Sequence, residues 1–260
     1  MEQPPPLLEP QPEASPPTMS LAARLLNIFA IPGDVFAELR GAPASVMNWL
    51  VPVTLFALVS ALAAVVLFSQ PAIQQQMREQ QAKVMDQQVK AGKMSQADAD
   101  KFLAMSEKFT SPTMMMIFGS VAAVVMSVVR VIWWGFVLWL LSMWFLKVRL
   151  DFAKTLEVAG LATMIGVLGV IVGLLLTINL SRVGASPSLA LALSDFDMTR
   201  KSHLALGAAN VFSFWLVGIM ATGLAKLANV PFLRAVLLVL AYWMAQESLL
   251  ILVGLGQLAQ

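Results

Sequence analysis

The chain has 260 residues, of which 58% are hydrophobic and only 12% charged, whereas roughly 25% of the residues in an ordinary soluble domain are charged. Its apolar residues form runs that can cross a hydrocarbon core of about 30 Å, which excludes a soluble globular protein. There is no cysteine, and His203 is the single histidine, which excludes thiolate and multi-histidine metal sites and cysteine nucleophiles. The net charge of +2 is too small and too dispersed to indicate a nucleic-acid partner.

The residues before the first long apolar run divide into two parts. Residues 1–19 hold seven prolines and three glutamates with few large apolar side chains, which predicts a disordered tail. Residues 20–48 contain two short amphipathic segments separated by Pro32 and Gly33, and Asp34 is placed to cap the second segment. Because both segments are too short to span a bilayer, we expect them to lie in the membrane interface.

Five long apolar segments follow, and they predict an all-α, polytopic membrane bundle of five transmembrane helices. They cover residues 49–68, 113–146, 158–178, 204–225 and 232–256. The second segment would extend about 51 Å as one helix, so two short passes are an alternative. It contains no Pro, Asn or Asp, and a turn inside lipid would leave backbone groups unpaired, so one long helix that protrudes at its first end is the better prediction.

Residues 70–111, between the first two spans, are polar but keep helical periodicity. Ile73, Met77 and Val84 recur at helical spacing, and Ser95 with Asp98 forms a capping-box pattern that opens a second helix. We therefore expect a helical hairpin outside the bilayer. Residues 181–202 predict a looser loop on the same side.

The orientation is predicted from the short loops. Three basic residues lie within residues 147–154, and Lys226 and Arg234 flank the turn before the last span. An excess of Lys and Arg in short loops favours the cytoplasmic side, although Arg200 and Lys201 flank the fourth span from the other side. We therefore expect a cytoplasmic N-terminus and an external C-terminus.

Two charged residues lie deep inside predicted spans, Arg130 in the second and Glu247 in the fifth. Either charge alone would be costly near the bilayer centre, and helix geometry places them at similar depths of about 17 Å and 14 Å. They are a candidate intramembrane ion pair, with Gln246, Asn210 and Asn179 as polar neighbours. The pair is interpreted either as an ion or proton site or as a structural contact that fixes helix register; the structural interpretation is preferred because a neutralised pair also satisfies itself.

Glycines in the third and fourth predicted spans are candidate helix-packing positions, because small residues let helix backbones approach closely in lipid. They are Gly166, Gly169, Gly173, Gly218 and Gly223. The sequence contains no nucleophile elbow, phosphate-binding glycine loop or HExxH string, so we expect no catalytic residue, cofactor or metal.

Three stretches, residues 27–40, 92–109 and 210–224, carry a resemblance to a known family. The first has a proline turn before an acidic-Phe helix, the second is a helical insert, and the third has a Phe/Trp pair followed by spaced glycines. In order and spacing, they resemble the Yip family of Ypt/Rab-interacting membrane proteins, and in particular its bacterial members.

The resemblance implies a five-span protein of the inner membrane with a cytoplasmic N-terminus. The Asp-Leu-Tyr-Gly-Pro type of motif associated with Rab binding is absent, so Rab-type GTPase binding does not carry over. The leading hypothesis is a non-enzymatic scaffold or membrane-organising protein, with the lipid bilayer as its environment and with other membrane proteins bound through residues 70–111 or the N-terminal helices. The alternative is a small-solute or ion transporter that uses Arg130 and Glu247, although no inverted repeat supports it.

Overall fold

The computed structural model describes residues 19–109, 111–193, 196–197 and 200–254, so the tail predicted over residues 1–19 lies outside the described residues except for Met19. All regular elements of the described chain are helices. They are α1 (Leu21–Asn27), α2 (Pro32–Gly41), α3 (Met47–Phe68), α4 (Pro71–Lys90), α5 (Gln96–Phe109), α6 (Pro112–Trp144), α7 (Phe152–Leu180), the 3₁₀ turn η1 (Leu189–Ala192), α8 (Lys201–Ala208), α9 (Val211–Ala228) and α10 (Phe232–Leu252).

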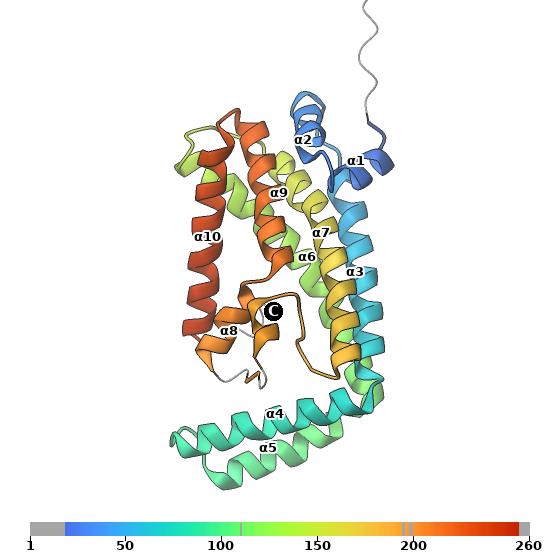
Figure 1. The fold of residues 1–260 in the computed structure, drawn as a ribbon, viewed down its shortest axis with the longest axis vertical. Coiled ribbons are helices and arrows are strands. Elements are labelled where there is room, and N and C mark those ends of the chain that lie inside the picture. The colour runs from blue at the N-terminus through green and yellow to red at the C-terminus, as the bar shows by residue number, and fades with distance from the viewer. Residues whose placement is uncertain (1–18, 110, 194–195, 198–199, 255–260) are drawn as a thin grey trace, which may run out of the picture.

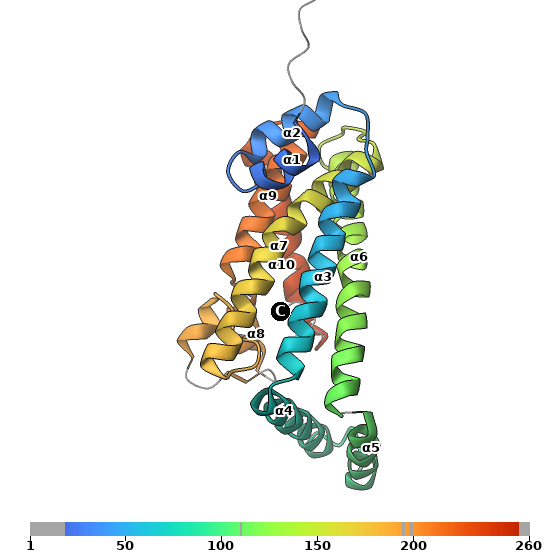
Figure 2. The same ribbon diagram turned by 90° about the vertical axis from the view of Figure 1, so that its right-hand side faces the viewer.

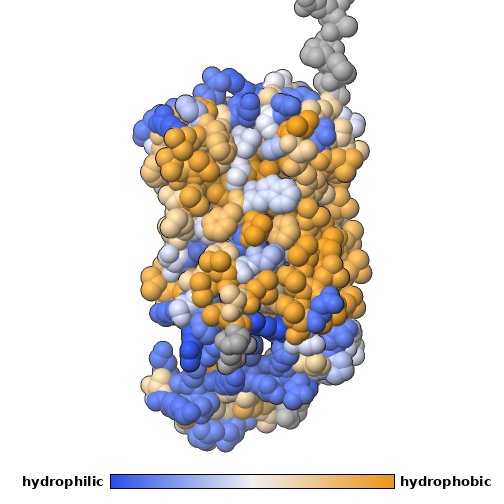
Figure 3. Space-filling view, in the orientation of Figure 1, coloured by the Kyte–Doolittle hydropathy of each residue, from blue (hydrophilic) through white to orange (hydrophobic). Residues whose placement is uncertain are grey.

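Five of these helices, α3, α6, α7, α9 and α10, are long and apolar enough to cross a membrane. Helix α7 packs against α3, α6 and α9, and α10 packs against the other side of α9 (Figures 1 and 2). Large apolar side chains are exposed around the bundle and form a broad hydrophobic band between two hydrophilic ends (Figure 3). The expected all-α, polytopic helical bundle is therefore confirmed.

The second span is one continuous helix, as expected. Helix α6 has 33 residues, Pro112 occupies its first turn, and the Ser111 hydroxyl accepts a hydrogen bond from the N–H of Met114. Proline suits this position because the first N–H groups of a helix have no intrahelical acceptor.

The fourth span differs from the prediction of residues 204–225. The helical pattern is broken at Ala209 and Asn210, which separate the short helix α8 from α9. Asn210 has an extended backbone and pairs with Ser188 in an isolated antiparallel bridge. The Asn210 side chain accepts a hydrogen bond from the N–H of Phe212 and so caps α9. The apolar periodicity is nearly continuous across this break, which is why the boundary was missed.

The two N-terminal helices pack on the end of the bundle. Helix α2 begins at Pro32, with Ile31 as a cap residue that makes no side-chain cap hydrogen bond, so Asp34 lies in the first turn and is not the cap that was expected. The apolar residues Val35, Phe36 and Leu39 are almost completely buried, because α2 packs against α9 and α7. Protein therefore covers these three apolar residues of α2, and the position of the two N-terminal helices in the membrane interface stays a prediction.

Helices α4 and α5 form a hairpin that lies across the opposite end of the bundle (Figures 1 and 2). The Ser95 hydroxyl accepts a hydrogen bond from the N–H of Asp98 at 3.1 Å and so caps α5. The first turns of α4 contact the bundle. Ile73 is 1% exposed, and the Gln76 side chain binds the backbone of Ser181 and Val183 just after α7.

Candidate functional site

The two intramembrane charges lie on neighbouring helices, Arg130 on α6 and Glu247 on α10, and each is within electrostatic range of the other. Among the described residues they do not form an ion pair within 4.0 Å. Glu247 Oε2 is buried and has no hydrogen-bond partner. Arg130 retains exposed surface, yet its side chain also lines a cavity of about 20 Å³ with Thr163 and Met220, which is room for about one water molecule.

Gln246 is a direct link between α6 and α10 beside Glu247. Its Oε1 accepts hydrogen bonds from Trp133 Nε1 at 3.0 Å and from the Tyr242 hydroxyl at 2.9 Å. The other two expected polar neighbours are used elsewhere. Asn179 donates to the Leu175 carbonyl near the end of α7, and Asn210 caps α9. Neither amide is hydrogen-bonded to Arg130 or Glu247 in the described part of the chain.

The candidate packing glycines have different surroundings. A Cβ atom at Gly166 would lie 3.0 Å from the Phe56 ring, one at Gly169 would lie 3.3 Å from Phe212, and one at Gly223 would overlap Val158. A Cβ atom at Gly173 would make only ordinary contact, at 3.8 Å, and one at Gly218 would meet nothing within 4 Å. Close packing thus occurs at three of the five positions.

A further close approach was not predicted. A Cβ atom at Gly160 on α7 would overlap the backbone of Trp49 on α3. This glycine lies outside the Gly166, Gly169 and Gly173 series, and the contact depends on where α3 crosses α7, which periodicity within α7 does not specify.

The best-connected polar cluster was also not predicted from the sequence. Glu157, on the second turn of α7, is 1% exposed. Its Oε1 accepts hydrogen bonds from the Ser45 N–H at 2.6 Å and from Asn48 Nδ2 at 2.7 Å. Its Oε2 lies 2.9 Å from Lys154 Nζ. The two groups form an ion pair, but their geometry does not meet the angle criteria of a hydrogen bond. Lys154 Nζ also donates to the Leu39 carbonyl at 2.7 Å, so this cluster joins α2, α3 and α7.

The cluster continues through α1. Arg24 donates to Asn48 Oδ1 at 3.0 Å and to Glu38 Oε1 at 2.6 Å, and the Met19 N–H also donates to the Glu38 carboxylate. Burial alone raises the pKa of Glu38, but hydrogen bonds from Arg24 and Met19, together with the Arg24 charge, outweigh it, so its pKa lies below the usual value. The signal available in the sequence was the pair Lys154 and Glu157, three residues apart at the start of an apolar run.

The fold and these buried polar contacts define a polytopic α-helical membrane protein whose N-terminal helices are joined to the bundle. The family model of the Yip1 domain matches residues 26–255, and the chain therefore belongs to the Yip1-domain family. Comparisons with curated proteins and with solved structures give no match.

Proposed function

We propose that this protein is a non-enzymatic scaffold of the inner membrane that binds other proteins through the hairpin α4–α5. The observation that carries the proposal is the exposure of two large apolar side chains on α5, where Phe102 is 46% and Met105 62% exposed. These residues lie one helical turn apart, on a hairpin outside the apolar band of the bundle (Figure 3). Exposed apolar side chains in such a position favour a protein partner. Rab-type GTPases are not proposed as that partner.

The proposed orientation has the N-terminus in the cytoplasm and the hairpin and C-terminus outside. Its support is the pair Lys147 and Arg149 in the α6–α7 connection, together with Lys226 and Arg234 in the helix turns that flank the α9–α10 connection. Both connections lie at the same end of the bundle as α1 and α2 (Figure 1). The proposed partners are therefore proteins that reach the external face of the membrane.

Transport is the second candidate function, and one observation favours it. The buried Glu247 Oε2 without a hydrogen-bond partner would be available to a cation or a proton. The neighbouring cavity lined by Arg130 has room for about one water molecule, which is too little for an organic solute. Scaffolding is therefore preferred, and a transported species would be a small ion.

The scaffold proposal is tested by photo-crosslinking in intact membranes, with a benzophenone amino acid placed at Phe102, Met105 or Lys83. Lys83 is exposed on α4 of the same hairpin and serves as the matched control. We expect discrete crosslinked protein species from Phe102 and Met105 and none of them from Lys83. No crosslinked protein from α5, or the same products from all three positions, would contradict a specific partner on α5.

A further inference from the structure

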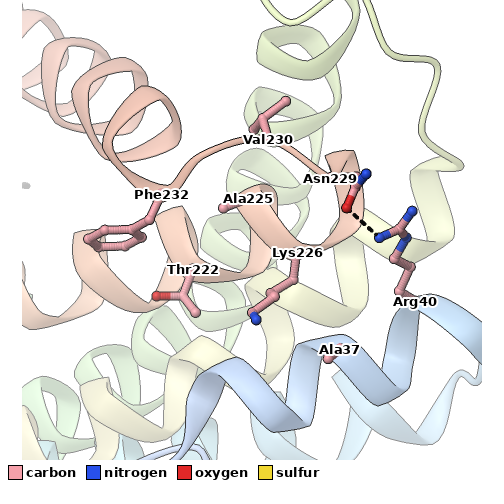
Figure 4. Close-up of a pocket in the computed structure, with 8 residues that line it drawn as sticks. All are labelled: Ala37, Arg40, Thr222, Ala225, Lys226, Asn229, Val230 and Phe232. Carbon is pink, nitrogen blue, oxygen red and sulfur yellow. Dashed lines mark hydrogen bonds between the residues drawn. The ribbon is translucent and has the colours of Figure 1, made fainter.

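A cleft of about 520 Å³ lies between α2 and the end of α9, at the face of the bundle that carries the N-terminal helices (Figure 4). One wall is formed by Ala37 and Arg40 of α2. The opposite wall is formed by the last turns of α9 and the turn into α10. Its lining residues from this wall are Thr222, Ala225, Lys226, Asn229, Val230 and Phe232.

The cleft holds two cationic side chains without a carboxylate partner in the described part of the chain. Arg40 donates one hydrogen bond, at 2.8 Å, to Asn229 Oδ1, which leaves its other guanidinium N–H groups available. The stem of Lys226 lies beside Gly33, where an added Cβ atom would be 3.5 Å from its Cε. Glu38 of α2 does not neutralise these charges, because its carboxylate is bound to Arg24.

The turn into α10 adds to this positive environment. Phe232, which lines the cleft, is the first residue of α10, and this helix end has no side-chain cap hydrogen bond. Uncapped N–H groups at a helix start favour an anion. The cleft is therefore cationic with a mostly apolar lining, and Asn229 Nδ2 can donate a neutral hydrogen bond, whereas the Thr222 hydroxyl already donates to the Gly218 carbonyl.

The position of the cleft indicates where the anion comes from. It lies where the hydrophobic band of α9 and α10 ends, and Phe232 and Leu233 beside it are 53% and 66% exposed, so apolar surface continues from the cleft toward the acyl chains. We infer that this cleft binds the phosphate of an anionic glycerophospholipid, with Arg40 and Lys226 contacting the phosphate and one acyl chain lying along Phe232 and Leu233. Paired cations at the interface are suited to such head groups.

The test measures binding of dioleoyl phosphatidylglycerol to the full-length protein in detergent by native mass spectrometry. Dioleoyl phosphatidylcholine serves as the zwitterionic lipid, and glycerol 1-phosphate as the soluble anion. The variants are R40Q/K226Q and the charge-matched control K147Q/R149Q, which removes two exposed cations from the α6–α7 loop on the same face. The single variant K226Q, which breaks no described hydrogen bond, covers the case in which R40Q impairs folding.

We expect R40Q/K226Q to weaken phosphatidylglycerol binding by about tenfold or more, K226Q to weaken it by a smaller factor, and K147Q/R149Q to leave it within about twofold of the parent protein. Phosphatidylcholine should show no such dependence. If R40Q/K226Q and K147Q/R149Q weaken phosphatidylglycerol binding equally, the lipid is attracted by the general positive charge of this face and not by a specific site. If neither R40Q/K226Q nor K226Q weakens binding, the proposed site is wrong. Glycerol 1-phosphate that binds as tightly as phosphatidylglycerol, and loses this binding in R40Q/K226Q, would assign the cleft to a soluble phosphate and overturn the lipid, because the acyl chains would then contribute nothing.

Discussion

At the scale of single residues, Glu157 and Glu247 show two different environments for a carboxylate within an apolar helix. Glu157 receives two hydrogen bonds and contacts Lys154, as a buried charge requires for stability. Glu247 has a buried oxygen without a hydrogen-bond partner and only the more distant charge of Arg130. Sequence position revealed Glu247, because it lies deep in an apolar run. It did not reveal the environment of Glu157, whose partners Ser45 and Asn48 are more than a hundred residues away.

This difference predicts unequal coupling energies in two double-mutant cycles. In the first, Arg130→Met and Glu247→Met should each lower the melting temperature of the protein in detergent, and the double variant should recover part of the loss. In the second, Lys154→Met and Glu157→Met should show the stronger coupling, because breaking a buried contact pair costs about 3 to 5 kcal/mol. Thermal unfolding of all six variants beside the parent protein measures both cycles.

The second cycle is the positive control for the first. If the Arg130 and Glu247 effects simply add, the two residues do not interact and the intramembrane pair is rejected. A double variant that is as stable as the parent but fails to restore the phenotype of a deletion strain would favour the transport hypothesis, since the fold would then be intact and only the charges lost.

At the scale of elements, the five spanning helices followed from composition and periodicity, whereas the break between α8 and α9 and the surroundings of α2 did not. The long helix α6 was predictable because a turn inside lipid would leave backbone N–H and C=O groups without hydrogen bonds, and the apolar segment contains no turn-forming Pro, Asn or Asp. The separation of α8 from α9 was not, because it depends on pairing between Asn210 and Ser188 in a different segment. The surroundings of α2 likewise depend on α9, because an amphipathic pattern specifies an apolar face but not whether lipid or protein covers it.

The hairpin α4–α5 gives the prediction at this scale. Because the first turns of α4 contact the bundle through the buried Ile73 and the hydrogen bonds of Gln76, we expect most of the stabilising contact of the hairpin to come from these turns. Replacing residues 78–109 with a Gly/Ser linker should therefore leave the melting temperature of the membrane bundle nearly unchanged. Replacing residues 72–109 should lower it, because this also removes Ile73 and the hydrogen bonds of Gln76. Thermal unfolding and size-exclusion profiles in detergent compare the two deletions. Aggregation of the shorter deletion would show that the outer part of the hairpin belongs to the folded core.

At the scale of the whole molecule, charges are divided between two ends separated by the apolar band (Figure 3). The end with α1 and α2 carries Lys147 and Arg149 in the α6–α7 connection, and Lys226 and Arg234 in the helix turns beside the α9–α10 connection. The other end carries the six basic and five acidic residues of segment 70–111. Since the orientation rule depends mainly on basic residues in short loops, the first end is expected to be cytoplasmic.

This orientation predicts which positions react with a membrane-impermeant maleimide applied to intact spheroplasts. The natural chain has no cysteine, so each introduced thiol is the only target. Cysteines at Ser95 in the hairpin and at Ser202 on α8 should react from outside, whereas one at Ala44, just before α3, should react only after permeabilisation; all three positions are exposed. Reaction at Ala44 in intact spheroplasts, with protection of Ser95 and Ser202, would invert the topology. It would also place the α5 surface in the cytoplasm, so the proposed external partners would have to be replaced by cytoplasmic ones.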